Sequence, residues 1–171
     1  MRGILAIMIG LVCVFVYPTQ ANTLTTINPK TVTEQDTLSL PKVFQLGDYE
    51  SQFEKLSVAH QTSLLTATDD DFNAMFEAWS SMLKEMQAHS QIVNYDLNGI
   101  KMWLNVFWDK NGKIEHIAFF LKPNSKNVDR VELGAFLTDF MNHYTFPVTA
   151  KDKFSHYSGA SFPLFTWKKK Q

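Results

Sequence analysis

Cysteine is almost absent from this chain: the single one, Cys13, lies near the N-terminus and none follows it. The rest of the chain therefore has no disulfide and no cysteine metal ligand, so a folded domain must depend on its hydrophobic core. Glycine is also scarce, at 7 residues, and neither GxGxxG nor GxxxxGK, the phosphate-binding loops, occurs. A net charge of −1 argues against a nucleic-acid partner, which would require a strongly basic face.

The N-terminal segment has the pattern of a secretory signal peptide. Arg2 precedes an apolar run over residues 3–17, and Thr19 and Ala21 place small side chains three residues and one residue before a cleavage point. The run is shorter than the ~20 residues that a membrane-spanning helix needs. We therefore expect residues 1–21 to be removed, leaving a secreted chain without a transmembrane segment, periplasmic if the source is a Gram-negative bacterium.

The remainder divides into a lead-in and one domain. Residues 22–40 are rich in Thr, Asn, Gln and Asp and show no apolar period, which predicts a flexible lead-in. Residues 41–171 are expected to form a single globular domain of ordinary size. Its first elements are predicted to be a short strand at 43–46 and a helix at 49–59.

Two longer helices are predicted from apolar residues at steps of three and four. The first runs from about Asp70 to His89, and the acidic cluster at 69–71 offers its N-cap. The second starts at Asn127 or Asp129. The apolar positions of the first are Phe72, Met75, Phe76, Trp79, Met82, Leu83 and Met86, and those of the second are Val131, Leu133, Phe136, Leu137, Phe140 and Met141.

Three consecutive strands are predicted between these helices, at 91–97, 100–109 and 113–122. Asn98-Gly99 is typical of a type I′ hairpin turn, and Lys110-Asn111-Gly112 supplies the second turn. A further strand is predicted at 162–167, where Pro163 marks an edge strand or the start of a strand. The expected fold is α+β, an antiparallel three- to four-stranded meander packed with two main helices.

The strand at 100–109 has apolar side chains on both faces. On one face every side chain is apolar, and the other face mixes Trp103 and Phe107 with polar neighbours. The second face is covered by another part of the chain, or it is a binding surface built on Trp103 and Phe107 with His116 and Phe120 alongside.

No catalytic or metal site is evident in the sequence, and no cofactor is expected. The five histidines show no HExxH or HxH arrangement, and no two of them are four residues apart. Ser155 and His156 lie in a segment rich in hydroxyl groups but without the GxSxG nucleophile elbow. We expect a loop leading into the last strand there.

One region resembles a known family. The pattern Leu104-x-Val106-Phe107-x-Asp109-Lys110-x-Gly112-Lys113-Ile114, with the helix after it and the exit at Tyr144-x-Phe146-Pro147, is similar to the TonB C-terminal domain over residues 100–148. This resemblance implies an antiparallel sheet backed by helices that pairs a strand with an envelope partner. The long proline-rich linker of TonB proteins is missing here, so energy transduction is not implied.

Together these features predict a secreted, non-enzymatic binding or interaction module with a protein partner in the cell envelope. Two alternatives remain open from the sequence. One is a small secreted hydrolase that uses the Ser155/His156 region, and the other is a carrier of a small apolar ligand held between sheet and helices.

The signal-peptide interpretation gives a direct prediction. When the chain is expressed in its source, the mature protein should begin at Asn22. The residues before it have the small side chains that signal peptidase requires next to the bond it cleaves. Mass spectrometry of the exported protein identifies its N-terminal peptide. A mature chain that still carries residues 3–17 would contradict the prediction.

Overall fold

The computed structural model describes residues 39–165, and these form an α+β fold with four helices and a five-stranded mixed sheet. The expected leader at 1–21, most of the lead-in at 22–40 and the end of the expected strand at 162–167 lie outside the described residues. The elements in chain order are β1 (Val43–Gln45), α1 (Glu50–Ala59), β2 (Thr62–Ser63), α2 (Leu64–Ala67), α3 (Phe72–Ile92), β3 (Lys101–Trp108), β4 (Ile114–Leu121), α4 (Arg130–His143) and β5 (Phe154–Ser161).

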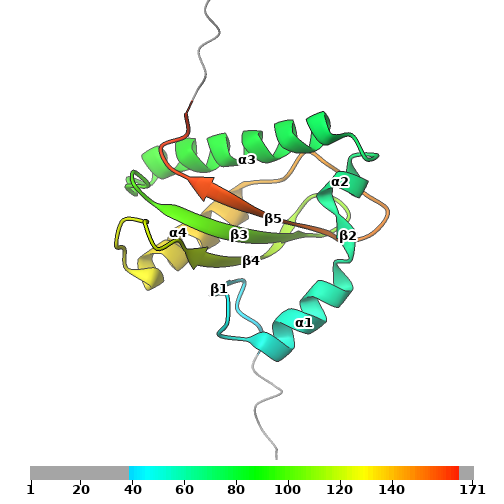
Figure 1. Ribbon diagram of the computed structural model, residues 1–171, viewed down its shortest axis with the longest axis horizontal. Coiled ribbons are helices and arrows are strands. Elements are labelled where there is room, and N and C mark those ends of the chain that lie inside the picture. The colour runs from blue at the N-terminus through cyan, green and yellow to red at the C-terminus, as the bar shows by residue number, and fades with distance from the viewer. Residues whose placement is uncertain (1–38, 166–171) are drawn as a thin grey trace, which may run out of the picture. The chain divides into compact units, whose positions relative to one another are not determined.

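The sheet has the order β1-β4-β3-β5-β2. Its three long strands are antiparallel, with β3 between β4 and β5, whereas the short edge strands β1 and β2 run parallel to their neighbours. Helix α1 connects these two edge strands, so it crosses one face of the sheet (Figure 1). The expected antiparallel meander of three to four strands is thus replaced by a mixed sheet.

Side-chain caps begin both long helices, as the sequence predicts. The Asp71 carboxylate accepts hydrogen bonds from the backbone N–H groups of Asn73 and Ala74, at 2.8 and 3.1 Å. The Asp129 carboxylate does the same for Val131 and Glu132, at 2.7 and 3.1 Å. Each cap satisfies backbone donors that have no partner inside the helix.

Helices α3 and α4 bury the face of β3 on which every side chain is apolar. This main core contains Met102, Leu104, Val106 and Trp108 of β3; Trp79, Met82, Leu83 and Met86 of α3; and Leu133, Phe136, Leu137, Phe140 and Met141 of α4. The apolar faces that the sequence predicts for these two helices are wider than the faces that are actually buried, however. Phe72 and Phe76 are 65% and 59% exposed, and Val131 is 81% exposed, because each lies on the side of its helix that turns away from the sheet.

Two predicted strands are wrong. The segment 91–97 first continues α3 as far as Ile92 and then forms turns, so Asn98-Gly99 leads the chain into β3 and does not close a hairpin. The Asp96 carboxylate holds this turn through the backbone and side-chain amides of Asn98. The last strand is β5, which ends at Ser161, so the predicted strand at 162–167 starts where strand pairing stops.

Within the described residues, no helix has the length and apolar character needed to cross a membrane. Residues 1–38 were not part of that search.

Two glycines with positive φ allow a controlled test of the turn between β3 and β4. Gly112 (φ +83°) accepts a hydrogen bond at its carbonyl oxygen from the Phe146 N–H at 2.9 Å, and an added Cβ would collide with the Phe146 carbonyl. Gly47 (φ +100°) has nothing within 4 Å of an added Cβ.

Gly47→Ala is expected to cost about 1–2 kcal/mol from backbone strain. Gly112→Ala carries the same strain plus about 1–3 kcal/mol of overpacking. Urea unfolding of both variants measures the difference, and equal losses would contradict the packing of residues 144–148 against this turn.

Candidate functional site

The second face of the sheet is covered at one end. Phe44 of β1, Phe107 of β3 and Ala118 of β4 form a small buried cluster, against which Tyr49, Phe53 and Leu56, with Leu40 and Leu46, pack. This cluster lies under α1. At the other end of the same face, three aromatic side chains remain exposed.

We call these three residues, Trp103, Phe120 and Tyr157, the aromatic platform. Trp103 lies opposite Phe120 in the β3–β4 ladder and opposite Gly159 in the β3–β5 ladder. Tyr157 is two residues before Gly159 and therefore shares this face. The three side chains are 37%, 47% and 55% exposed, respectively. The platform therefore spans the three central strands.

The platform is held in shape by direct contacts. The rings of Trp103 and Tyr157 are stacked, with 5.4 Å between centroids and 19° between planes. The Lys122 ammonium lies 4.0 Å from the centroid of the Trp103 ring, a cation–π contact. A Cβ at Gly159 would lie 3.3 Å from the Trp103 ring and 2.6 Å from Lys122 Nζ. Glycine at position 159 thus lets the indole and the lysine lie across β5.

The structure separates the four residues that the sequence singled out for binding. Trp103 and Phe120 lie together on the platform, whereas Phe107 is 1% exposed beneath α1. His116 is half-buried beside the same cluster, and its Nδ1 lies 3.0 Å from the Pro41 carbonyl oxygen. Burial lowers the pKa of His116 and outweighs the opposing effect of this hydrogen bond.

Tyr157 is not among the predicted binding residues, because the sequence predicts a loop for its segment. The pattern Ser155-His156-Tyr157-Ser158-Gly159 lacks the apolar alternation that usually marks a strand, yet it is the partner of β3. A single large aromatic residue in a segment of otherwise polar and small residues is the signal that could have marked Tyr157 as a surface position.

Ser155 and His156 lie on opposite faces of β5, because neighbouring strand residues alternate. The Ser155 hydroxyl donates to the His60 carbonyl oxygen at 3.0 Å. His156 packs against Trp79 of α3, with 4.8 Å between ring centroids, and burial lowers its pKa. These two neighbours therefore do not form a nucleophile and its base.

A polar network lies at the end of α1. His60, 2% exposed, places Nε2 at 2.9 Å from a Glu115 carboxylate oxygen and Nδ1 at 2.8 Å from the Leu56 carbonyl oxygen. Both ring nitrogens thus lie within hydrogen-bond distance of an oxygen atom. Lys153 donates to both oxygens of Glu115 at 2.8 Å. The network ties α1 to β4 and to the segment before β5.

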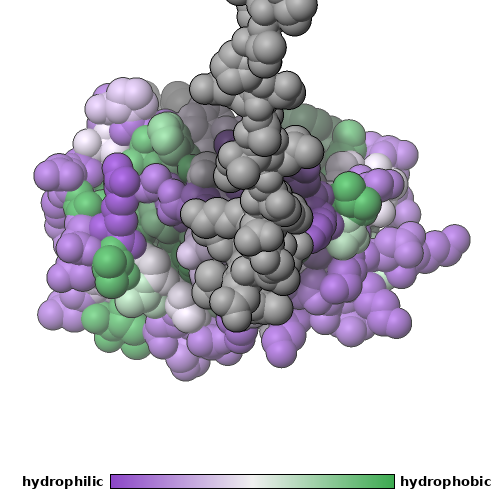
Figure 2. Space-filling view, turned by 90° about the horizontal axis from the view of Figure 1, so that it is seen from below, coloured by the Kyte–Doolittle hydropathy of each residue, from purple (hydrophilic) through white to green (hydrophobic). Residues whose placement is uncertain are grey.

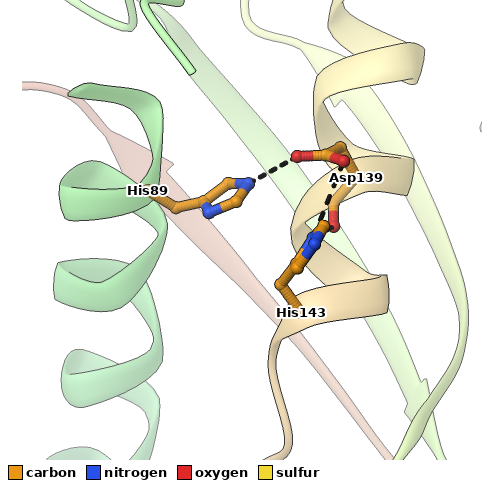
Figure 3. A group of neighbouring side chains, drawn as sticks. All are labelled: His89, Asp139 and His143. Carbon is orange, nitrogen blue, oxygen red and sulfur yellow. Dashed lines mark hydrogen bonds and ion pairs between the residues drawn. The ribbon is translucent and has the colours of Figure 1, made fainter. Parts of the chain in front are cut away.

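A second cluster of titratable side chains joins α3 to α4 (Figure 3). His89 Nε2 lies 2.7 Å from Asp139 Oδ2, and His143 Nδ1 lies 2.8 Å from the Asp139 carbonyl oxygen and 3.6 Å from Oδ1. One ligand atom from each of the three residues lies within 4.8 Å of the others. Asp139 and His143 are an acid and a histidine four residues apart on one helix, a signal that spacings between histidines alone do not reveal.

The described surface also has a pocket of about 450 Å³ beside the C-terminal end of α3. Most of its lining side chains are polar: Gln87, Ser90, Gln91, Asn94, Asp96 and Asn98, with Tyr95, Leu97, Phe162 and Pro163. Such a lining suits a polar ligand better than an apolar one. Seen from below the orientation of Figure 1, the surface outside the grey atoms is mainly hydrophilic, with separate hydrophobic groups (Figure 2).

Comparisons of this chain with protein-family models, with curated proteins and with solved structures found no match.

Glu115 should make folding stability sensitive to acid. Burial by itself would raise the pKa of the Glu115 carboxyl, but the hydrogen bonds from Lys153 and His60 outweigh burial and lower it below 4.5. A carboxyl whose pKa is depressed by folding contributes stability above its unfolded value and loses it as the pH falls through the folded value. The contribution of Glu115 is therefore present at neutral pH and lost below about pH 4.5.

Accordingly, Glu115→Gln should unfold at lower urea concentration than the wild type at pH 7, and the gap should narrow as the pH falls from 4.5 towards 3. Glu77→Gln, at an exposed position of α3, is the matched control. A gap between wild type and Glu115→Gln that stays constant over this range would contradict the assignment.

Proposed function

We propose that this protein is a non-enzymatic binding module of the cell envelope, and that the aromatic platform is the surface on which it holds a protein partner. The proposed occupant is an extended, acidic segment of that partner. The observation that carries the proposal is the stacked, exposed arrangement of Trp103 and Tyr157 beside Phe120.

The aromatic side chains support a contact surface because their exposure costs free energy that burial would recover. Aromatic residues are large and rigid, so they lose little conformational entropy when a partner covers them, and they are enriched at the centres of interfaces. The stacking of Trp103 on Tyr157 already fixes both rings before a partner arrives. A preformed surface of this kind lowers the cost of association.

Charge around the platform supports an acidic partner. Lys122 lies over the Trp103 ring, and Lys101, two residues before Trp103, belongs to the same face of β3. Lys101 and Lys122 therefore belong to the end of the sheet that α1 leaves uncovered. An acidic segment would pair with these lysines while its apolar groups lie on the rings.

Two features of the sequence support the envelope and a protein partner. The signal-peptide pattern at residues 1–21 favours export. The resemblance of residues 100–148 to the TonB C-terminal domain favours an envelope protein as the occupant over a small molecule.

A photo-crosslinking experiment tests the proposal. The full chain, with p-benzoylphenylalanine in place of Tyr157, is incubated with an envelope extract of its source, illuminated and resolved by mass spectrometry. We expect a specific protein to be crosslinked through an acidic segment. Trp103→Ala should lower its yield several-fold. Lys122→Glu should also lower it, because charge repulsion replaces attraction, and raised salt should lower the wild-type yield, because it screens that attraction.

The same crosslinker at Phe72 is the control, because Phe72 is at least as exposed but lies on α3, away from the platform. Equal crosslinking of the same protein from positions 157 and 72 would contradict the proposal. So would a yield from position 157 that neither Trp103→Ala nor Lys122→Glu changes.

A further inference from the structure

We propose that His89, Asp139 and His143 form a binding site for a divalent transition-metal ion of the Zn²⁺ type, which joins α3 to α4. This site is separate from the aromatic platform. The cluster lies between two helices that cover the main-core face of the sheet, whereas the platform lies on the other face.

The geometry brings three ligand atoms together from two elements. His89 comes from the last turns of α3, and Asp139 and His143 come from successive turns of α4 (Figure 3). Residues four apart on a helix share one face, so α4 presents its carboxylate and its imidazole to the same point. With these atoms within 4.8 Å of one another, small side-chain rotations bring each to the ~2.0–2.2 Å that Zn²⁺ requires.

The donor set matches the chemistry of the ion. Imidazole nitrogen and carboxylate oxygen are Zn²⁺ ligands, and three protein ligands with a fourth position left to water form a common site. One carboxylate also offsets half of the charge of the ion. The side chains of Asp139 and His143 are 44% and 64% exposed, so an ion can enter from solvent and keep a water ligand.

The surroundings orient the two imidazoles. Nδ1 of His143 donates to the backbone carbonyl of Asp139, which leaves Nε2 as the ring nitrogen available to a metal ion. A ring N–H held by a backbone carbonyl is the usual second contact of a metal-binding histidine. His89 is 14% exposed and lies against the rings of Phe136 and Phe140, at 6.1 and 5.9 Å between centroids. These rings restrict its rotation.

Further acidic charge lies nearby. Glu85 is four residues before His89 on α3, so the two side chains share one face of that helix. Glu85 is not among the three ligand atoms that converge, but its carboxylate adds to the attraction of a cation to this end of the two helices.

The competing explanation is a simple hydrogen-bonded contact between α3 and α4, in which His89 and Asp139 pair without any ion. The two explanations differ in one respect. A hydrogen-bonded contact needs His89 and Asp139, whereas a metal site also needs the exposed His143 side chain.

The test is titration of the purified, tag-free full chain with Zn²⁺, followed by calorimetry, and with Co²⁺, followed by its visible absorption. We expect about one ion per chain, a rise in the unfolding temperature with Zn²⁺, and visible bands of nitrogen- and oxygen-bound cobalt. His143→Ala should weaken binding at least ~10–100-fold, since losing a ligand costs no less than losing a hydrogen-bond partner of a ligand. Asp139→Asn should weaken it similarly.

Asn142→Ala is the matched control, because Asn142 is the neighbouring exposed residue on α4. It should bind Zn²⁺ as the wild type does, and circular dichroism should show all variants folded. The proposal is overturned if the wild type takes up no Zn²⁺ or Co²⁺. It is equally overturned if His143→Ala retains wild-type affinity, which would place the ion elsewhere on the chain.

Discussion

The packing of α1 across one end of the sheet is the constraint on which the rest of the surface depends. A helix with its side chains is about 10–12 Å wide, while a strand advances about 3.3 Å per residue. A crossing helix therefore covers about three or four residues of a strand, and β3 has eight. Phe107 falls under α1 and is buried, whereas Trp103, four residues earlier on the same face, is left at the open end.

This constraint follows from the way the chain connects its edge strands. Strands β1 and β2 lie at opposite edges, and the ten residues of α1 are the main connection between them. A helix that crosses the sheet from one edge to the other cannot also cover the full length of its strands. The network of His60, Glu115 and Lys153 then fastens the end of α1 to β4 and to the residues before β5. Together these contacts fix which part of the face is core and which part is surface.

The elements that the sequence predicts correctly carry local signals. Asp71 and Asp129 cap α3 and α4, and alternating apolar residues with a glycine turn define β3 and β4. The elements that it misses depend on distant partners. Strand β5 has small and polar residues, and it becomes a strand because β3 offers it a ladder from Trp108 to Lys101. The segment 91–97 has strand-like residues, but no strand partner lies beside it among the described residues.

The same distinction applies to the candidate sites: local patterns are visible in the sequence, whereas contacts between distant elements are not. The sequence indicates Trp103 and Phe120 because they lie on strands with a clear alternating pattern, but it does not show that α1 buries Phe107. His89, Asp139 and His143 lie on helices that were correctly predicted. Their convergence depends on the register of α3 against α4, which side-chain packing in the main core decides.

The two faces of the sheet also keep the two proposed sites independent. The main core, with its large side chains from Met102 to Trp108, lies between the platform and the helices that carry the histidines. Effects of substitutions at well-separated sites with no shared partner add, so loss of His143 leaves the stacking of Trp103 on Tyr157 unchanged. A metal ion between α3 and α4 would therefore act on the stability of the scaffold that presents the platform, and not on the chemistry of the platform itself.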